Sequence, residues 1–78
     1  MKSIYVEIKL FASLSKYTPP DSDHFPIPSD ITADGLAAHL TLPADQVKLI
    51  FINGRKRPPT TVIKEGDRIG IFPPVGGG

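Results

Sequence analysis

The sequence predicts an α+β fold in which a mixed sheet wraps around one helix. Three features of the chain predict this fold. An alternating strand pattern opens the chain, one short amphipathic helix occupies its middle, and two apolar strands follow, the first of which ends in an Asn-Gly turn. The predicted order is therefore strand, strand, helix, strand, weak strand, strand.

The first part of the chain supplies two strands joined by a long loop. Residues 4–11 have apolar side chains at alternate positions, as in a strand with one buried side. Residues 12–23 are rich in Ser, Pro and Asp and predict a loop, with a short turn near residues 13–17. Residues 24–28 contain alternate prolines, which restrict them to an edge strand or an extended segment.

A short helix is predicted over residues 33–40. Leu36 and Leu40 lie four residues apart, on the same stripe as two alanines. Residues 29–32 supply several side chains that can cap the first turn. Residues 43–47 can form a further helical turn with proline at its first position.

The remaining strands lie in the second half. Residues 48–52 are nearly all apolar, so we expect a central strand there. Asn53-Gly54 is a strong signal for a two-residue hairpin turn. Residues 60–63 predict a short, weak strand, and residues 68–72 predict the strand that closes the sheet, with its two isoleucines facing the same way.

Composition argues against several classes of protein. The chain is long enough for one small domain, and without cysteine it has neither a disulfide framework nor a thiolate zinc site, which fits a cytoplasmic protein. The net charge of +1 gives no reason to expect nucleic acid, and no apolar run approaches the length of a membrane span. His24 and His39 lack metal-ligand spacing, so we expect no metal site.

The charge is unevenly distributed along the chain. Residues 1–39 contain three Lys against five Asp or Glu, whereas residues 40–78 contain six Lys or Arg against three Asp or Glu. Three of these cations are consecutive, at Arg55, Lys56 and Arg57, beside the predicted turn. They form either a solvated hairpin tip or an electrostatic docking patch for an acidic partner.

The sequence ends in three glycines that follow a proline-containing spacer. Pro73 and Pro74 favour an extended chain. Glycine is costly to immobilise but lacks a Cβ, so Gly76–Gly78 could enter a slot that is too narrow for other residues. From the last strand, this stretch could reach roughly 20 Å at about 3.3 Å per residue. We therefore expect a domain over residues 1–75, a flexible tail over residues 76–78, and the carboxylate of Gly78 as the reacting group.

The element order and the closing motif resemble the ubiquitin-like β-grasp sulfur carriers of the MoaD/ThiS family. The resemblance covers the whole chain and is strongest in Ile52-Asn53-Gly54-Arg55 and from Glu65 to Gly78. The second segment combines a Gly-Asp turn, an apolar strand, Phe-Pro-Pro-Val and the glycines. The resemblance implies a β-grasp fold, with the mixed sheet wrapped around one helix.

The resemblance also implies a carrier that is not itself a catalyst and binds no cofactor. In this family an adenylating, E1-like enzyme uses ATP and Mg to convert the last glycine carboxylate, here that of Gly78, to an acyl adenylate. A sulfur donor such as a cysteine desulfurase or rhodanese then displaces AMP and leaves a thiocarboxylate. Gly76 and Gly77 let the backbone pass. The large subunit of molybdopterin synthase, or thiazole synthase, would consume the sulfur.

Several residues bear on which partner and which branch of the family apply. Phe11 and Phe72-Pro73-Pro74-Val75 look like the molybdopterin type, and the two aromatics match positions that contact the partner in that family. Ordinary core packing is the alternative for both rings. Gly76 and the basic segment 55–57 depart from the molybdopterin type. The resemblance favours the molybdopterin or tungstopterin branch over the thiamine branch.

Two other functions remain open at this stage. A ubiquitin-like modifier would also be adenylated at Gly78, but its tail would form isopeptide bonds with lysines of target proteins. A plain β-grasp interaction domain would have an inert tail. We find no catalytic constellation in the sequence, so an enzyme is not expected.

Overall fold

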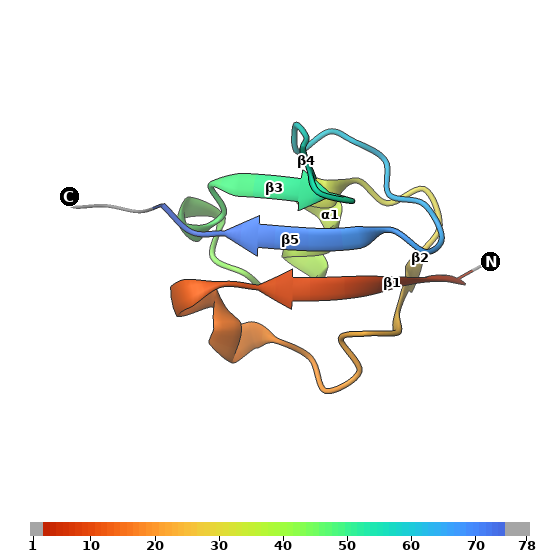
Figure 1. Cartoon of the computed structure of the whole chain (residues 1–78), viewed down its shortest axis with the longest axis horizontal. Helices are drawn as coiled ribbons and strands as arrows, with labels where there is room; N and C mark the ends of the chain where they lie inside the picture. Colours follow the sequence, from red (N-terminus) through yellow and green to blue (C-terminus); the bar gives the residue numbers. More distant parts are fainter. Residues whose placement is uncertain (1–2, 75–78) are drawn as a thin grey trace.

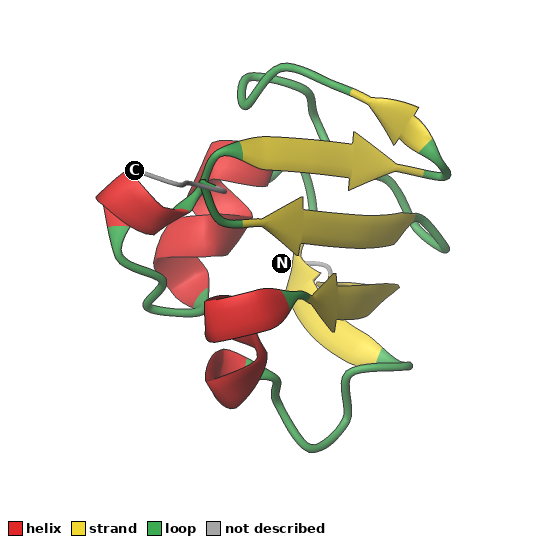
Figure 2. Cartoon of the chain, turned by 60° about the vertical axis from the view of Figure 1, so that its left-hand side comes forward, coloured by secondary structure: helices red, strands yellow, loops and turns green. Residues whose placement is uncertain are grey.

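A computed structural model describes residues 3–74 and has the predicted α+β architecture, a five-stranded sheet with helical segments packed on one of its faces (Figures 1 and 2). In chain order the elements are β1 (Ser3–Leu10), η1 (Ala12–Tyr17), β2 (Phe25–Pro28), α1 (Ala33–His39), η2 (Ala44–Gln46), β3 (Leu49–Ile52), β4 (Arg55–Lys56) and β5 (Arg68–Phe72). The elements η1 and η2 are 3₁₀ helices that occupy the predicted turns.

The strand order across the sheet is β2-β1-β5-β3-β4. The neighbouring strands β1 and β5 come from opposite ends of the chain and pair in parallel, while every other neighbouring pair is antiparallel. In Figure 1, α1 lies behind β3 and β5. This is the mixed sheet around one helix that defines a β-grasp fold, as the sequence predicted.

One face of the sheet packs against α1 and forms the core. The alternation in β1 buries Val6 and Ile8, and β5 buries Ile69 and Ile71 on the same side. Leu36, fully buried on α1, packs against this face as part of the same cluster. The period of two in the strands therefore leaves the opposite face of the sheet to solvent.

The helix begins and ends with defined capping structures. The side-chain hydroxyl of Thr32 accepts a hydrogen bond of 3.0 Å from the N–H of Gly35, one of the caps expected from residues 29–32. At the other end, the N–H of Leu42 donates to the carbonyl of Ala37 and that of Thr41 to Ala38, both at 3.0 Å. This is a Schellman motif, and it places Thr41 in the left-handed region with φ of 61°.

The strand that follows the hairpin turn differs from the prediction. Asn53 and Gly54 both have positive φ, as the predicted turn requires, and the short strand β4 follows immediately at Arg55–Lys56. The prediction of a weak strand over residues 60–63 is wrong. That segment forms backbone hydrogen bonds with the start of α1 instead, and its only β-type pairing among the described residues is an isolated bridge between Thr32 and Val62. It therefore covers the N-terminal end of the helix and does not extend the sheet.

The position of β3 also differs from the prediction. The strand is adjacent to the edge strand β4, and the central strand of the sheet is β5. Its apolar run arises because Leu49 and Phe51 are half-buried on the open face while Ile50 and Ile52 are buried on the helix face. A continuous apolar strand therefore marks an apolar patch here, and not burial on both faces.

Prolines occupy one outer edge of the sheet, the strand β2. Pro26 and Pro28 pair with Tyr5 and Ser3 across the β1–β2 ladder, at positions whose backbone nitrogens point away from β1. On the other side, Pro58 and Pro59 follow β4 after Arg57, outside the strand itself. Because proline has no N–H, it offers no donor to a further strand.

Candidate functional site

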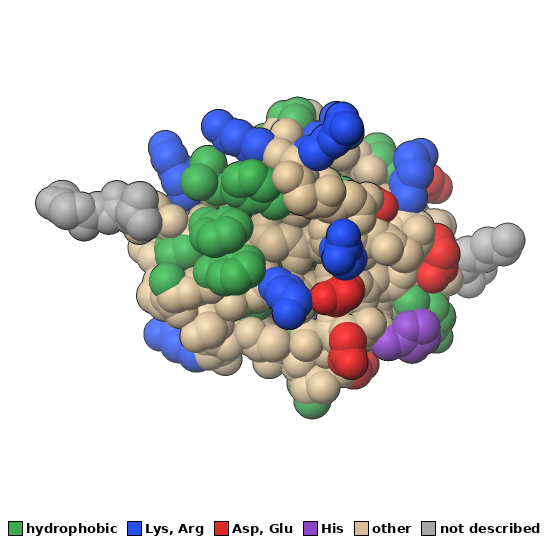
Figure 3. Space-filling view, in the orientation of Figure 1, with side chains coloured by type: hydrophobic (Ala, Val, Ile, Leu, Met, Phe, Trp, Pro, Cys, Tyr) green, Lys and Arg blue, Asp and Glu red, His purple; other side chains and the backbone are tan. Residues whose placement is uncertain are grey.

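Three phenylalanine rings form a cluster on the open face of the sheet. The rings of Phe11 and Phe72 stack in parallel with centroids 4.2 Å apart, and the ring of Phe51 meets that of Phe72 edge to face at 5.4 Å. Phe11 is 37% exposed. Figure 3 shows this apolar patch at the end of the sheet where β5 stops. The two aromatics singled out in the sequence therefore lie together, outside the core.

A shallow hollow of about 360 Å³ adjoins the rings, and Gly70 lies at its centre. Gly70 pairs with Lys9 on β1 and with Phe51 on β3, so the hollow has a lysine on one side and an aromatic ring on the other. A Cβ built on Gly70 would lie 3.3 Å from Cε2 of Phe11. The missing side chain thus lets the Phe11 ring lean over β5 and leaves space on the sheet. We call this space the open-face hollow.

Charged residues surround the open-face hollow. Lys9 and Arg68 line it and are exposed, and Glu7, opposite Arg68 in the β1–β5 register, lines it as well. Lys56 is paired with Phe51 just beyond the ring cluster. In Figure 3, Lys and Arg side chains ring the apolar patch, whereas Asp and Glu gather on the other half of the same face.

The predicted partner-binding residues fall into three groups. Phe11 and Phe72 belong to the ring cluster, and Arg55, Lys56 and Arg57 are exposed on and beside β4. Pro73 is buried and Pro74 is exposed directly after β5. The carbonyl of Phe72 accepts a hydrogen bond of 3.0 Å from the N–H of Lys48, so the last strand is held up to its final residue. Val75, Gly76, Gly77 and Gly78 lie outside the described residues.

A second motif, Asn53-Gly54 with Gly66-Asp67, has a structural role. The side-chain amide of Asn53 donates to Oδ1 of Asp67 at 2.9 Å, and its oxygen accepts from the N–H of Arg68 at 3.0 Å. The second oxygen of Asp67 accepts from the N–H of Lys64 at 2.9 Å. These contacts join the β3–β4 turn to the turn before β5.

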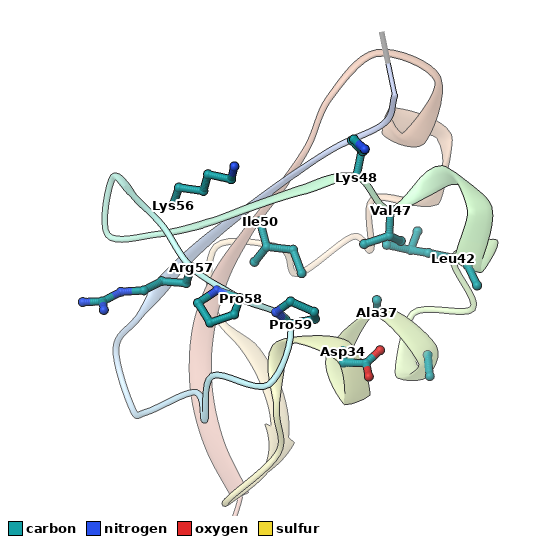
Figure 4. Close-up of a pocket in the computed structure, with 12 residues that line it drawn as sticks. Asp34, Ala37, Leu42, Val47, Lys48, Ile50, Lys56, Arg57, Pro58 and Pro59 are labelled. Carbon is teal, nitrogen blue, oxygen red and sulfur yellow. The ribbon is translucent and has the colours of Figure 1, made fainter. Parts of the chain in front are cut away.

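A larger groove of about 520 Å³ lies on the opposite side of the sheet, between α1 and β3 (Figure 4). Ala37, Val47, Ile50 and Pro59 converge on it, and the side chain of Arg57 points away from it. Most of its lining is apolar, and the charged residues Asp34, Lys48 and Lys56 also border it. It provides a reference surface against which binding at the open face can be judged.

Two negative findings, on metal sites and on membrane-spanning helices, apply to the residues that the structure describes. Within residues 3–74, no group of three or more His, Asp or Glu side chains is placed to hold a metal ion. No helix in this range has the length and hydropathy needed to cross a membrane.

The family of the chain follows from a sequence profile that matches nearly its whole length. The profile of the ThiS family matches residues 8–78. The chain belongs to the ThiS family. The match includes β1 from Ile8, the ring cluster and the glycines, so the open face of this ThiS-family protein lies within the family's homologous region. No curated protein matches the sequence significantly.

Solved structures share the fold of this ThiS-family protein. The Haloferax volcanii HVO 2177 protein has a TM-score of 0.75 at 22% identity, over 97% of this chain and 88% of its own. A Pyrococcus furiosus protein named as a candidate molybdopterin converting factor, subunit 1, has a TM-score of 0.70 at 23% identity, over 94% and 100%. Small archaeal modifier protein 1 of H. volcanii has 0.67 at 21%, over 92% and 99%.

Sequence reasoning missed two residues of this face. The sequence predicts Phe51 only as part of a central apolar strand, and it indicates no role for Gly70. Signals for both are present in the sequence. A glycine inside an apolar strand often marks a close approach to the sheet, and an aromatic ring opposite it supplies cover.

Proposed function

We propose that this ThiS-family protein is a sulfur carrier whose reacting group is the carboxylate of Gly78. An adenylating partner activates the carboxylate, and a sulfur donor converts it to a thiocarboxylate. A second partner then uses the sulfur in cofactor synthesis. The protein acts as carrier and substrate, and the catalytic groups belong to its partners.

The chemistry explains why the carrier needs so few functional groups. A carboxylate repels nucleophiles, so its oxygen first attacks the α-phosphate of ATP, which releases pyrophosphate and forms an acyl adenylate. Hydrosulfide or an equivalent sulfur nucleophile then attacks the carbonyl carbon and AMP leaves. The activating enzyme supplies Mg and the electrostatic stabilisation of both steps. The carrier must present its last residue and bind its partner.

The observation that carries this proposal is the ThiS-family match, which runs through Gly78. The arrangement of the open face supports it. Phe72 is the last residue of β5 and belongs to the ring cluster, so a partner that docks on these rings lies beside the end of β5, four residues before Gly76 in the sequence. Aromatic residues are enriched among the strongest contacts of protein interfaces. We therefore propose that Phe11, Phe72, Pro74 and Val75 bind the partner, together with Arg55, Lys56 and Arg57 on and next to β4. Pro73, expected to take part, is buried.

Molybdopterin synthesis is the pathway that we favour. The Phe-Pro-Pro-Val motif before the glycines supports it, and the structural likeness to the P. furiosus protein named as a molybdopterin converting factor subunit agrees with it. Thiamine synthesis is the alternative within the same chemistry. Loss of the gene followed by measurement of both cofactors separates the two pathways.

A second candidate function is protein modification. The structural likeness to small archaeal modifier protein 1 favours it, and a modifier would use the same activated carboxylate. In that case a lysine amine, and not a sulfur nucleophile, would attack the acyl group. Conjugates of high molecular weight that depend on Gly78 would support this function over the carrier.

The deciding experiment weighs the intact chain before and after activation. The protein is first isolated from its source, and its mass establishes whether Gly78 is the last residue. It is then incubated with its activating enzyme, ATP, Mg and sodium sulfide. We expect a mass gain equal to the exchange of one oxygen for sulfur, located at Gly78 by fragmentation. An unchanged mass would contradict the proposal.

Two tail variants serve as controls. Gly77→Ala places a Cβ in the segment that must enter the activating site, so we expect normal folding and severely slowed adenylation. Deletion of Gly77-Gly78 should abolish it. If the deleted protein still supports cofactor synthesis in cells, the tail is inert and the protein is an interaction domain.

A further inference from the structure

The open-face hollow has features that indicate what kind of surface it receives. Gly70 leaves its floor without a side chain, at the middle of the central strand of the sheet. Glycine weakens a strand interior, and at such a position it often marks a site that another group approaches closely. The Phe11 ring leans over Gly70 from one side, yet a hollow of about 360 Å³ remains. The space suits an apolar side chain from outside.

The walls of the hollow divide into an apolar side and a cationic side. Phe72 and Phe51 provide ring faces and edges on the side toward the end of β5. Lys9 lies opposite Phe51 across Gly70, and Arg68 lies two residues before Gly70 on the same strand. Both cations are exposed, so their charged groups are available to a partner while their aliphatic stems line the space.

The charges beyond the hollow have the same sign at this end of the face. Lys56 is exposed and is the cross-strand partner of Phe51; it also borders the groove between α1 and β3, as Lys48 does. The one anion of the lining, Glu7, lies opposite Arg68 in the β1–β5 register. A surface with an apolar centre and a cationic rim is complementary to an apolar side chain surrounded by carboxylates.

We propose that the open-face hollow receives one apolar side chain from an acidic surface of a partner protein, whose carboxylates face Lys9 and Arg68. This inference rests on the proposed function, since it specifies the chemistry of the partner that docks beside the tail. A partner with a basic surface at this position would be repelled. The charge arrangement thus selects among otherwise similar partners.

Synthetic peptides test the proposal without knowledge of the partner. Three peptides of equal length share a central Leu-Phe and carry Asp and Glu, Ser and Gln, or Lys on both sides. Each is titrated into the ¹⁵N-labelled chain, and amide chemical shifts report the site and the Kd. We expect saturable shifts at Gly70 and its neighbours with the acidic peptide, with a Kd about tenfold below that of the neutral peptide.

Charge variants locate the effect. Lys9→Glu combined with Arg68→Glu should weaken binding of the acidic peptide about tenfold. Lys16→Glu combined with Lys64→Glu changes the net charge equally at exposed sites outside the hollow, and should leave the Kd within about twofold. Gly70→Ala reduces the depth of the hollow and should weaken all peptides that bind there, while the spectrum stays that of a folded protein.

Several results would overturn the proposal. They are equal affinity for the acidic and neutral peptides, preference for the basic peptide, no binding of any peptide, and shifts confined to the groove at Ala37 and Ile50. Shifts that depend on protein concentration alone would indicate a second copy as the occupant. The assay needs no ATP or tail chemistry, so thiocarboxylate formation without acidic-peptide binding would refute this inference alone, and the reverse result would refute the carrier function alone.

Discussion

The side-chain amide of Asn53 donates a hydrogen bond of 2.9 Å to the carboxylate of Asp67, although the two residues lie in different turns. The same Asn53 side chain accepts from the N–H of Arg68 at the start of β5. The β3–β4 hairpin is therefore fastened to the strand that leads into the tail. Both turns also need a left-handed backbone, at Asn53, Gly54 and Gly66.

Loss of this link should destabilise the protein. Asn53→Gly keeps the positive φ but removes both side-chain hydrogen bonds, and we expect it to lower the free energy of unfolding by about 1–2 kcal/mol. Asn53→Ala should cost more because alanine is strained at φ of 55°. Urea denaturation measures both. In a double-mutant cycle with Asp67→Ala, simple additivity would contradict the link.

A single substitution at the C-terminal end of α1 should increase the stability of the protein. Thr41 is β-branched and has φ of 61°, at the position of a Schellman motif where glycine is usual. Thr41→Gly should therefore raise the free energy of unfolding by about 1 kcal/mol, seen as a Tm higher by about 4–8 °C.

Ala38→Gly is the matched control for that change. Ala38 is exposed within the same helix, where glycine costs about 0.5–1 kcal/mol, so the Tm should fall. A fall in Tm for both variants would show that Thr41 does not occupy the left-handed region in solution.

Phe11 should matter more for docking than for folding. The residue is 37% exposed and stacks on Phe72 alone among the aromatic residues, so Phe11→Ala should cost about 1 kcal/mol of stability. Thiocarboxylate formation by the activating enzyme should nevertheless slow markedly. Ile71→Ala, at a position that is fully buried, should cost about 2–5 kcal/mol. Normal activation of the Phe11 variant at full stability would remove Phe11 from the docking surface.

Replacing the prolines of β2 should allow the edge of this strand to pair with other copies of the protein. Pro26→Thr with Pro28→Thr restores two outward N–H donors on an edge strand, so association that increases with protein concentration is expected in sedimentation velocity. Pro20→Thr, in the loop before β2, should leave the protein in the association state of the wild type. Equal behaviour of the two variants would mean that the edge is protected by something else.

Local patterns predicted most of the fold. The alternation in β1, the Asn-Gly turn and the two isoleucines of β5 each depend on residues close in sequence, and each prediction is confirmed. The parallel pairing of β1 with β5 brings residues from opposite ends of the chain together, and the sequence predicted a mixed sheet without indicating which strands pair.

The incorrect predictions concern segments whose structure depends on contacts with residues far away in the sequence. The segment 60–63 has strand-like residues, but the start of α1 supplies its hydrogen-bond partners. Leu49 and Phe51 looked like a buried run because apolar patches on a surface have the same composition as a core. The hollow over Gly70 depends on the register of three strands, which no single stretch of sequence encodes.

The prolines on the outer edge of β2 bear on how much exposed apolar surface the protein can carry without aggregating. A domain that displays three phenylalanines is at risk of seeding fibres, because an apolar face and a free strand edge together template growth. Because Pro26 and Pro28 remove the outward N–H donors of β2, that edge of the sheet cannot donate to an incoming strand, and the aromatic face can stay exposed with less risk of strand-by-strand growth.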